Sequence, residues 1–283
     1  MSSVDYAITK EQTDRAIHIL VTFDKNYIPP FRVMLKSLAV SNPKEIFHFW
    51  LLHSNIPNDD LLGLSEYCSK QRMTLTPIQV DRDLFDKAPV SKQYPQEMYY
   101  RLMAPLLLPD TLKRVLYLDP DILVINPVRR LWEKALGEYS FAAASHSSNF
   151  EIIKDVNQIR LGNGHDYFNT GILLMDLEKG REIVNKEDIF SCVREQGEIL
   201  LLPDQDIFNI LYGIHTLQID DNIWNYDTRF FSAYFMKSEG QYDMDWVMQN
   251  TVFLHFCGKQ KPWKKKYLNS FSALYKHYMN LAK

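Results

Sequence analysis

Cysteine is scarce in this chain, which holds only Cys68, Cys192 and Cys257 among 283 residues. Three scattered cysteines are too few for a disulfide framework or a zinc cluster, and they fit a reducing compartment. Long apolar runs are also missing, because the run Leu102–Leu108 is short and is broken by Pro105. A membrane-spanning helix needs about 20 apolar residues, so none is predicted.

A strong excess of one charge is absent too. The net charge of −3 argues against a general nucleic-acid binder, so no nucleic-acid partner is expected. The first residues, Met1–Asp14, are polar and mixed in charge, without the apolar core of a signal peptide. We therefore expect a cytoplasmic protein. A length of 283 residues suits one large α/β domain with a substantial core.

Apolar strands alternate with helical patterns in the first 118 residues. Strands are predicted at Ala16–Phe23, Glu45–Leu52, Met73–Val80 and Leu112–Leu118, and helices at Tyr27–Val40 and Asn58–Ser69. Further strands are expected at Phe141–Ser145, Phe168–Leu174 and Ile214–Ile219, helices at Glu178–Arg194 and Asp204–Leu211, and a surface excursion at Asn149–Tyr167. This alternation predicts an α/β fold with a mostly parallel sheet flanked by helices.

Two carboxylates, Asp119 and Asp121, follow the strand Leu112–Leu118. Side chains two residues apart in extended chain leave the same face, so this pair can grip one ion. Pro120 lacks an N–H and suits a stiff turn at a strand end. Ligands of parallel sheets gather at the carboxyl ends of strands, where Asp24 also falls. The pattern indicates a hard divalent cation that holds phosphate.

The Asp-x-Asp spacing alone does not select this copy. It recurs at Asp81/Asp83, Asp204/Asp206 and Asp243/Asp245. Only the copy at Asp119 and Asp121 has runs dense in Leu, Ile and Val on both sides, as a buried parallel strand requires. A solvated turn at a strand end is the alternative interpretation, because Asp and Pro both favour turns.

Three polar segments border later apolar runs. They read Phe168-Asn169-Thr170-Gly171, Pro203-Asp204-Gln205-Asp206 and His255-Phe256-Cys257-Gly258-Lys259-Gln260-Lys261-Pro262-Trp263. The last segment offers an imidazole, two lysines and a glycine that lets backbone N–H groups approach an anion. Taken singly, each also has a structural reading: Asp204 as a helix cap, Asn169 in a turn and His255 as a packing residue.

With Val21-Thr22-Phe23-Asp24-Lys25-Asn26-Tyr27 at the front, the ordered set of segments resembles the family 8 retaining glycosyltransferases. This family contains bacterial lipooligosaccharide galactosyltransferases and the glycogenins. The match runs from about residue 17 to 263 and includes the pattern His-x-Cys-Gly-x-x-Lys-Pro-Trp. The resemblance implies an A-type glycosyltransferase fold, Rossmann-like and in a single domain, a UDP-sugar donor and Mn²⁺, with Mg²⁺ as an alternative.

The family pattern also implies a role for particular residues. Asp119, Asp121 and His255 would bind the metal, and mixed carboxylate and imidazole ligands suit manganese better than calcium. Donor-binding residues match at Thr22, Asp24, Asn26, Tyr27, Arg101, Asn169, Gly258 and Lys261. Within this set, Asp24, Asn26 and Tyr27 would hold the uracil, and Gly258 and Lys261 the phosphates.

Gln205, Asp204 and Arg101 match the family's catalytic positions. Gln205 faces the anomeric carbon in the family, and an amide is a poor nucleophile. We therefore favour front-face transfer, with Asp204 as the reserve nucleophile. One departure concerns the donor sugar, because many relatives carry an aspartate where this chain has Ala144-Ser145-His146. Galactose and glucose both remain open.

The last residues form a separate chemical region. Residues 259–283 contain seven lysines and no acid, and Tyr267, Phe271, Leu274, Tyr278 and Leu281 recur at helical spacing. We expect a glycosyltransferase domain at 14–258 and a basic amphipathic helical tail at 259–283. The tail either packs on the domain or contacts the inner membrane face peripherally.

The expected activity is metal-dependent transfer of galactose or glucose from a UDP-sugar to a glycan or glycolipid in cell-surface polysaccharide synthesis. Two alternatives are a non-catalytic UDP-sugar-binding protein and a glycogenin-like initiator that glucosylates itself. Acceptor contacts are expected from residues 90–99 and 222–245. The aromatic residues of the second segment either stack on a sugar or pack the C-terminal half: Trp224, Tyr226, Phe230, Phe231 and Tyr234.

Overall fold

A computed structural model of the chain describes residues 15–81, 84, 96–145, 164–196 and 200–283. The polar start at 1–14, most of the expected excursion at 149–167 and most of the acceptor segment at 90–99 lie outside these residues.

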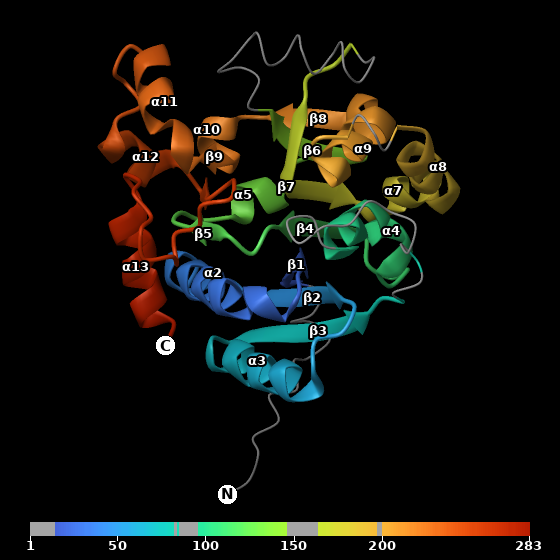
Figure 1. The fold of residues 1–283 in the computed structure, drawn as a ribbon, viewed down its shortest axis with the longest axis horizontal. Coiled ribbons are helices and arrows are strands. Elements are labelled where there is room, and N and C mark those ends of the chain that lie inside the picture. Colours follow the sequence, from blue (N-terminus) through green and yellow to red (C-terminus); the bar gives the residue numbers. More distant parts are fainter. Residues whose placement is uncertain (1–14, 82–83, 85–95, 146–163, 197–199) are drawn as a thin grey trace, which may run out of the picture.

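The central sheet has seven strands: β1 (Ile17–Thr22), β2 (Phe47–His53), β3 (Met73–Gln79), β4 (Arg114–Leu118), β6 (Phe141–Ser145), β7 (Phe168–Asp176) and β8 (Thr216–Ile219). Their order is β3-β2-β1-β4-β7-β6-β8 (Figure 1). Neighbours pair in parallel, except that β7 is antiparallel to both β4 and β6. The predicted mostly parallel α/β sheet is confirmed.

Helices cover both faces of this sheet. The α-helices are α2 (Ile28–Ser41), α3 (Asn58–Lys70), α4 (Ala104–Leu107), α5 (Arg129–Trp132), α7 (Leu177–Ile183), α8 (Lys186–Gln196), α9 (Pro203–Tyr212), α10 (Asp221–Trp224), α11 (Phe231–Lys237), α12 (Met244–Asn250) and α13 (Ser272–Leu281). On β1, Ile19 faces the core under α2 and α3, whereas Leu20 faces the core under α7, α8 and α9. Both are fully buried, as a parallel sheet covered on two faces requires.

A second, smaller sheet was not predicted. It has the order β5-β10-β9, with β5 (Ile122–Val124), β10 (Phe253–His255) and β9 (Tyr226–Asp227). β10 is antiparallel to β5 and parallel to β9. Strands of two or three residues are too short for an alternating pattern to reveal them.

Two helix predictions need correction. The single helix expected at Glu178–Arg194 is two helices, α7 and α8, because Val184 adopts an extended backbone with φ −80° and ψ 120°. Asn185 then accepts a bond from the backbone N–H of Glu187 at 2.9 Å, which supports a new helix start.

The C-terminal tail is also less helical than expected, because α13 covers only residues 272–281. Tyr267 and Phe271 precede this helix, yet both are buried together with Tyr275 in the core around β10. In Figure 1 α13, drawn in red, lies beside α2, and the two helices are in contact. Among the described residues, no helix has the length and apolar character to span a membrane.

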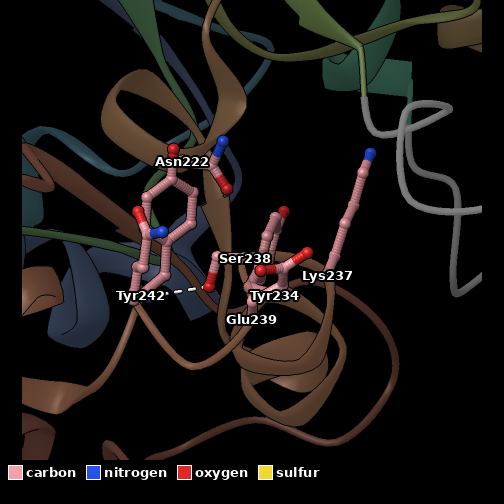
Figure 2. Close-up of a pocket in the computed structure, with 7 residues that line it drawn as sticks. Asn222, Tyr234, Lys237, Ser238, Glu239 and Tyr242 are labelled. Atoms are coloured by element: carbon pink, nitrogen blue, oxygen red, sulfur yellow. Dashed lines mark hydrogen bonds between the residues drawn. The ribbon is translucent and has the colours of Figure 1, made fainter.

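The segment 222–245 contains an open polar pocket of about 420 Å³. Its lining includes Asn222, Glu239 and Tyr242, and Ser238 accepts a hydrogen bond from the backbone of Tyr242 at 2.8 Å (Figure 2). Of the two alternatives for the aromatic residues of this segment, packing describes most of them, because Trp224, Tyr226 and Tyr234 are buried. For example, Tyr226 stacks on Tyr234 with ring centroids 4.4 Å apart.

Candidate active site

The sheet topology gathers the candidate residues at one edge. β1 and β4 are parallel, so Asp24 and Asp119 both follow strand ends at this edge. β7 runs the opposite way and therefore begins here, which brings in Asn169. The backbone N–H of Asp119 donates to the carbonyl of Gly171 at 2.8 Å, so the end of β4 and the start of β7 are in contact.

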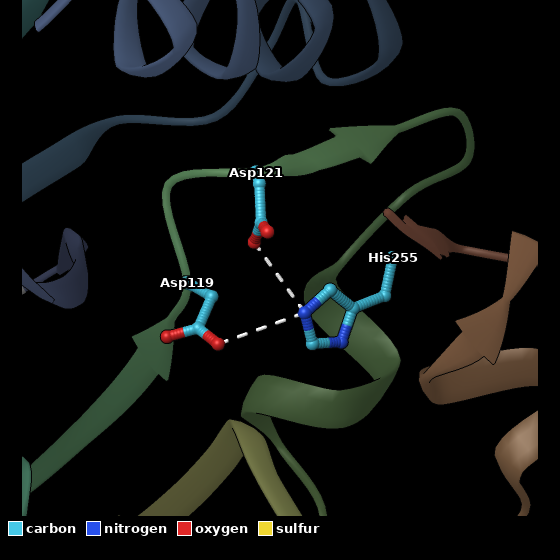
Figure 3. A group of neighbouring side chains, drawn as sticks. All are labelled: Asp119, Asp121 and His255. Carbon is cyan, nitrogen blue, oxygen red and sulfur yellow. Dashed lines mark ion pairs between the residues drawn. The ribbon is translucent and has the colours of Figure 1, made fainter. Parts of the chain in front are cut away.

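The small sheet places the histidine beside the aspartates. His255 pairs with Ile122, the residue after Asp121, and the N–H of Phe256 donates to the carbonyl of Asp121 at 3.1 Å. His255 Nε2 lies 3.4 Å from Asp121 Oδ1 and 3.6 Å from Asp119 Oδ2. Figure 3 shows the three side chains pointing toward one another. One candidate ligand atom from each lies within 4.8 Å of the other two.

The trio combines acidic and basic groups, and Lys261 lies beside it. Burial acts to raise the pKa of Asp121, but Lys261 and His255 outweigh it and hold that pKa well below its usual range. For His255, burial acts to lower the pKa, while Cys257 and Asp121 raise it well above its ordinary value. Of these two neighbours of His255, Asp121 is the ionised one, because burial raises the pKa of the Cys257 thiol and keeps it neutral at pH 7. Lys261 Nζ contacts Asp121 directly.

Arg101 joins Asp119, at the end of β4, to the first turn of α9. It lies in a 3-10 helix at Gln96–Met103 and is 8% exposed. Its Nη1 is 3.0 Å from Asp119 Oδ1, and its Nε is 3.3 Å from Asp204 Oδ2. Burial acts to lower the pKa of Arg101, but Asp119, Tyr117 and Asp204 raise it above the ordinary value. One buried cation is therefore shared between two carboxylates.

Asp204 and Gln205 occupy the first turn of α9 and are 8% and 9% exposed. Thr170 donates from Oγ1 to Asp204 at 3.3 Å, and Asn169 donates from Nδ2 to Gln205 Oε1 at 3.1 Å. Burial raises the pKa of Asp204, and Arg101 counteracts part of that rise.

The expected uracil residues lie at the end of β1. Asp24 accepts bonds from the backbone and side-chain amides of Asn26 at 2.9 and 2.8 Å. Thr22 Oγ1 is 3.4 Å from the hydroxyl of Tyr117. The ring of Tyr27 meets Trp263 edge-on at 5.8 Å, and burial followed by Asp121 raises its pKa.

After β10 the chain turns at Gly258, whose φ of +87° is a left-handed conformation that favours glycine. The departure noted at Ala144-Ser145-His146 falls at the end of β6. Ser145 is 1% exposed there and pairs with Phe168, and His146 is outside the described residues.

Sequence reasoning missed several residues of this site. Tyr117 donates its hydroxyl to Asp119 at 2.5 Å, and its ring lies 4.4 Å from the guanidinium carbon of Arg101. Asn225 bonds to both His255 and Asn169. Tyr117 could have been found, because it precedes Asp119 by two residues on a strand. Asn225 carried no such signal, since it lies in a short connection.

Gly171 packs closely against His255 and Asp119. A Cβ on this residue would be 2.2 Å from His255 Cε1 and 2.9 Å from Asp119 Oδ2. We expect Gly171→Ala to lower the free energy of unfolding by about 1–3 kcal/mol, as overpacking does, because relief requires moving the imidazole off the two carboxylates. Urea unfolding measures this. Gly164→Ala, where a Cβ meets nothing within 4 Å, should change stability by under about 0.5 kcal/mol. Equal effects of the two substitutions would contradict the packing argument.

Fold and site together define a carboxylate–imidazole centre at the strand ends of an α/β sheet. Residues 18–267 match the sequence model of the family described as glycosyl transferase family 8. The chain belongs to glycosyltransferase family 8 and is a glycosyltransferase.

Individual relatives are similar to this chain over most of its length. General stress protein A of Bacillus subtilis is 27% identical over 276 residues, 95% of each chain. The lipopolysaccharide 1,2-glucosyltransferase of Escherichia coli K12 is 25% identical over 270 residues, which are 92% of this chain and 77% of that enzyme. The solved galactosyltransferase LgtC, in complex with donor and acceptor sugar analogues, matches with a TM-score of 0.78 at 22% identity, over 94% of this chain and 96% of its own. The expected A-type fold in a single domain is confirmed.

Proposed function

We propose that this glycosyltransferase transfers a hexose, galactose or glucose, from a UDP-sugar to a glycan or glycolipid acceptor in cell-surface polysaccharide synthesis. Retention of the anomeric configuration is part of the proposal. Relatives that are a glucosyltransferase and a galactosyltransferase support a hexose donor. The observation that carries the proposal is the convergence of Asp119, Asp121 and His255 on one point, with Lys261 beside them.

A divalent cation fits this donor set. The two carboxylates and the imidazole would hold Mn²⁺, with Mg²⁺ as the alternative. When bound, the cation supplies Lewis-acid stabilisation of the negative charge that develops on the departing diphosphate.

The protein's own groups provide the remaining steps. Asp24 and Asn26 read the uracil edge, Tyr27 stacks on the base with Thr22 beside it, and Lys261 with the backbone at Gly258 binds phosphate. Gln205 faces the anomeric carbon and steadies its positive charge through Oε1. Asn169 orients that amide by donating to the same oxygen.

The reaction proceeds on the front face. The acceptor hydroxyl bonds to the anomeric carbon as the C–O bond to UDP breaks, and its proton moves to a leaving phosphate oxygen. Asp204, the alternative nucleophile, is engaged by Arg101 and Thr170, which reduces its nucleophilicity.

The deciding experiment is a donor screen by UDP release with UDP-glucose, UDP-galactose and their N-acetyl forms, with and without Mn²⁺. We expect Mn²⁺-dependent release from a hexose donor. Release that is unaffected by a chelator, or absent for every donor, would overturn the proposal. Intact mass after incubation with UDP-glucose separates transfer to another molecule from self-glucosylation of any of the 16 tyrosines.

The domain at 14–258 would then be assisted by its tail at 259–283. Lys264, Lys265 and Lys266 are exposed, and the neighbouring Leu268 is 94% exposed. Each lysine near an anionic bilayer contributes about 1 kcal/mol, so reversing all three to Glu should weaken binding to anionic vesicles at least roughly 100-fold. Vesicle sedimentation measures this.

A matched control is the triple reversal at the exposed residues Lys44, Lys70 and Lys113. Charge reversal suits this test better than truncation, because the tail also buries Tyr267, Phe271 and Tyr275. Equal losses of vesicle binding for the two triple variants would mean that only net charge matters, and would contradict a peripheral membrane contact through the tail.

A further inference from the structure

We infer that Asn225 is a positioning residue, which fixes the orientation of the metal-binding imidazole and of the catalytic amide together. It follows α10, precedes β9 and is 0% exposed. Its side chain bridges His255 and Asn169, and Asn169 in turn contacts Gln205. The inference rests on the proposed function, because it assigns a role toward the metal and the sugar.

The donor and acceptor of each hydrogen bond in this network follow from one backbone group. The N–H of Gly171 can only donate, and it donates to Asn169 Oδ1 at 2.9 Å. That oxygen is therefore an acceptor, so the Asn225 atom 2.8 Å from it is the amide nitrogen, Nδ2. Asn225 consequently turns Oδ1 toward His255.

The neutral form of the imidazole, which is the form that binds a cation, then has one permitted arrangement. Asn225 Oδ1 lies 2.9 Å from His255 Nδ1, so Nδ1 carries a hydrogen and donates it. The Nε2 atom is the one that faces Asp119 and Asp121. A neutral imidazole with hydrogen on Nδ1 presents its lone pair at Nε2, which is where a cation held by the two carboxylates would bind.

At its other end, the hydrogen-bond network orients the amide of Gln205. With Oδ1 of Asn169 occupied by Gly171 and Asn225, its Nδ2 points to Gln205 Oε1 at 3.1 Å. Asn225 therefore couples metal affinity and sugar chemistry through separate atoms of one side chain. Its oxygen accepts from His255. Its nitrogen donates to Asn169, which in turn donates to Gln205.

Two substitutions separate these atoms. Asn225→Leu has a similar shape and removes both functions, so Mn²⁺ affinity and kcat should each fall about 10–100-fold, as for loss of a group that orients a metal ligand. Asn225→Asp keeps an oxygen acceptor for His255 but cannot donate to Asn169. It should bind Mn²⁺ as tightly as the wild type or more tightly, while kcat falls about 10–100-fold.

Free Mn²⁺ measured by electron paramagnetic resonance gives the dissociation constant without any turnover. Imidazole ¹⁵N resonances of the Mg²⁺-loaded protein report the tautomer, which should be Nδ1–H in the wild type and lose that bias in Asn225→Leu. If Asn225→Leu does not fold, the split between kcat and Mn²⁺ affinity in Asn225→Asp decides alone.

Asn42→Asp is the matched control. Asn42 is 5% exposed, accepts from the N–H of Val128 at 2.9 Å and donates to the carbonyl of Leu38 at 3.2 Å, all outside the site. It should leave Mn²⁺ affinity and kcat within about twofold of wild type. Unchanged Mn²⁺ affinity in Asn225→Leu, or unchanged kcat in Asn225→Asp, would overturn this inference alone. A wild-type protein that binds no Mn²⁺ would overturn the proposed function as well.

Discussion

Replacing Asp121 with asparagine is expected to reduce UDP release at least about 100-fold, the loss typical of removing one preorganised electrostatic group. The substitution keeps the shape of the side chain and removes the charge that faces His255 and Lys261. Mn²⁺ affinity should fall in parallel, because a neutral amide is a weaker ligand than a carboxylate. UDP release at saturating donor and Mn²⁺ titration measure the two effects.

The same variant should be less stable without metal. Asp121 is 6% exposed, and its replacement removes the carboxylate that pairs with Lys261 and one of the two that face His255, at a cost of about 3–5 kcal/mol. The pKa of Asp121 is held below its ordinary 3.8 in the folded protein, so ionised Asp121 stabilises the fold above about that pH. This contribution is lost as pH falls toward the lowered pKa. The deficit of the variant should therefore be largest at neutral pH and shrink in acid.

Asp245→Asn is the matched control, since it alters another Asp-x-Asp copy. Asp245 is exposed in the first turn of α12. It should leave UDP release and the unfolding free energy close to wild type. Retained Mn²⁺-dependent release in Asp121→Asn would show that the carboxylate is not a ligand.

The four Asp-x-Asp copies show how far the sequence could predict the site. The flanking apolar runs singled out Asp119 and Asp121, and the structure places this pair at the end of β4 beside His255. The other copies differ in ways that no spacing encodes. Asp206, for example, is fully buried and accepts the N–H groups of Leu201 and Leu202 at 2.7 and 3.1 Å, whereas Asp243 caps α12.

The central parallel strands β1, β2 and β4 were predictable because each lies in an apolar run. The position of His255 was not, since it depends on β10 pairing with β5, a strand of three residues about 130 positions earlier in the chain. The reversed direction of β7 was equally hidden, although it brings Asn169 to the edge where β1 and β4 end. The family resemblance implied that these residues meet, whereas local periodicity could not.

Arg101→Met is expected to be among the most destabilising single substitutions in this chain. It removes the cation that pairs with Asp119 and Asp204, bonds the Thr170 carbonyl at 3.0 Å and lies over the Tyr117 ring. The buried Asp204 and the partly exposed Asp119 then lose their cation and keep only uncharged or more distant partners, which costs about 3–5 kcal/mol. Native stability is typically about 5–15 kcal/mol, so much of it would be lost. Urea unfolding measures the change.

The pH dependence identifies the cause of that loss. Burial already raises the pKa of Asp204, and without Arg101 the pKa should rise further. The folded variant then binds a proton that the unfolded chain does not hold, so its stability should fall as pH rises from 5 to 8 and recover in acid. Arg101→Lys keeps the charge without the planar fork and should lose less. Arg114→Met is the control, because its Nη1 bonds the carbonyl of Trp132 at the other end of β4. A deficit that is equal at both pH values, or equal for Met and Lys, would mean that shape and not charge compensation determines what Arg101 contributes.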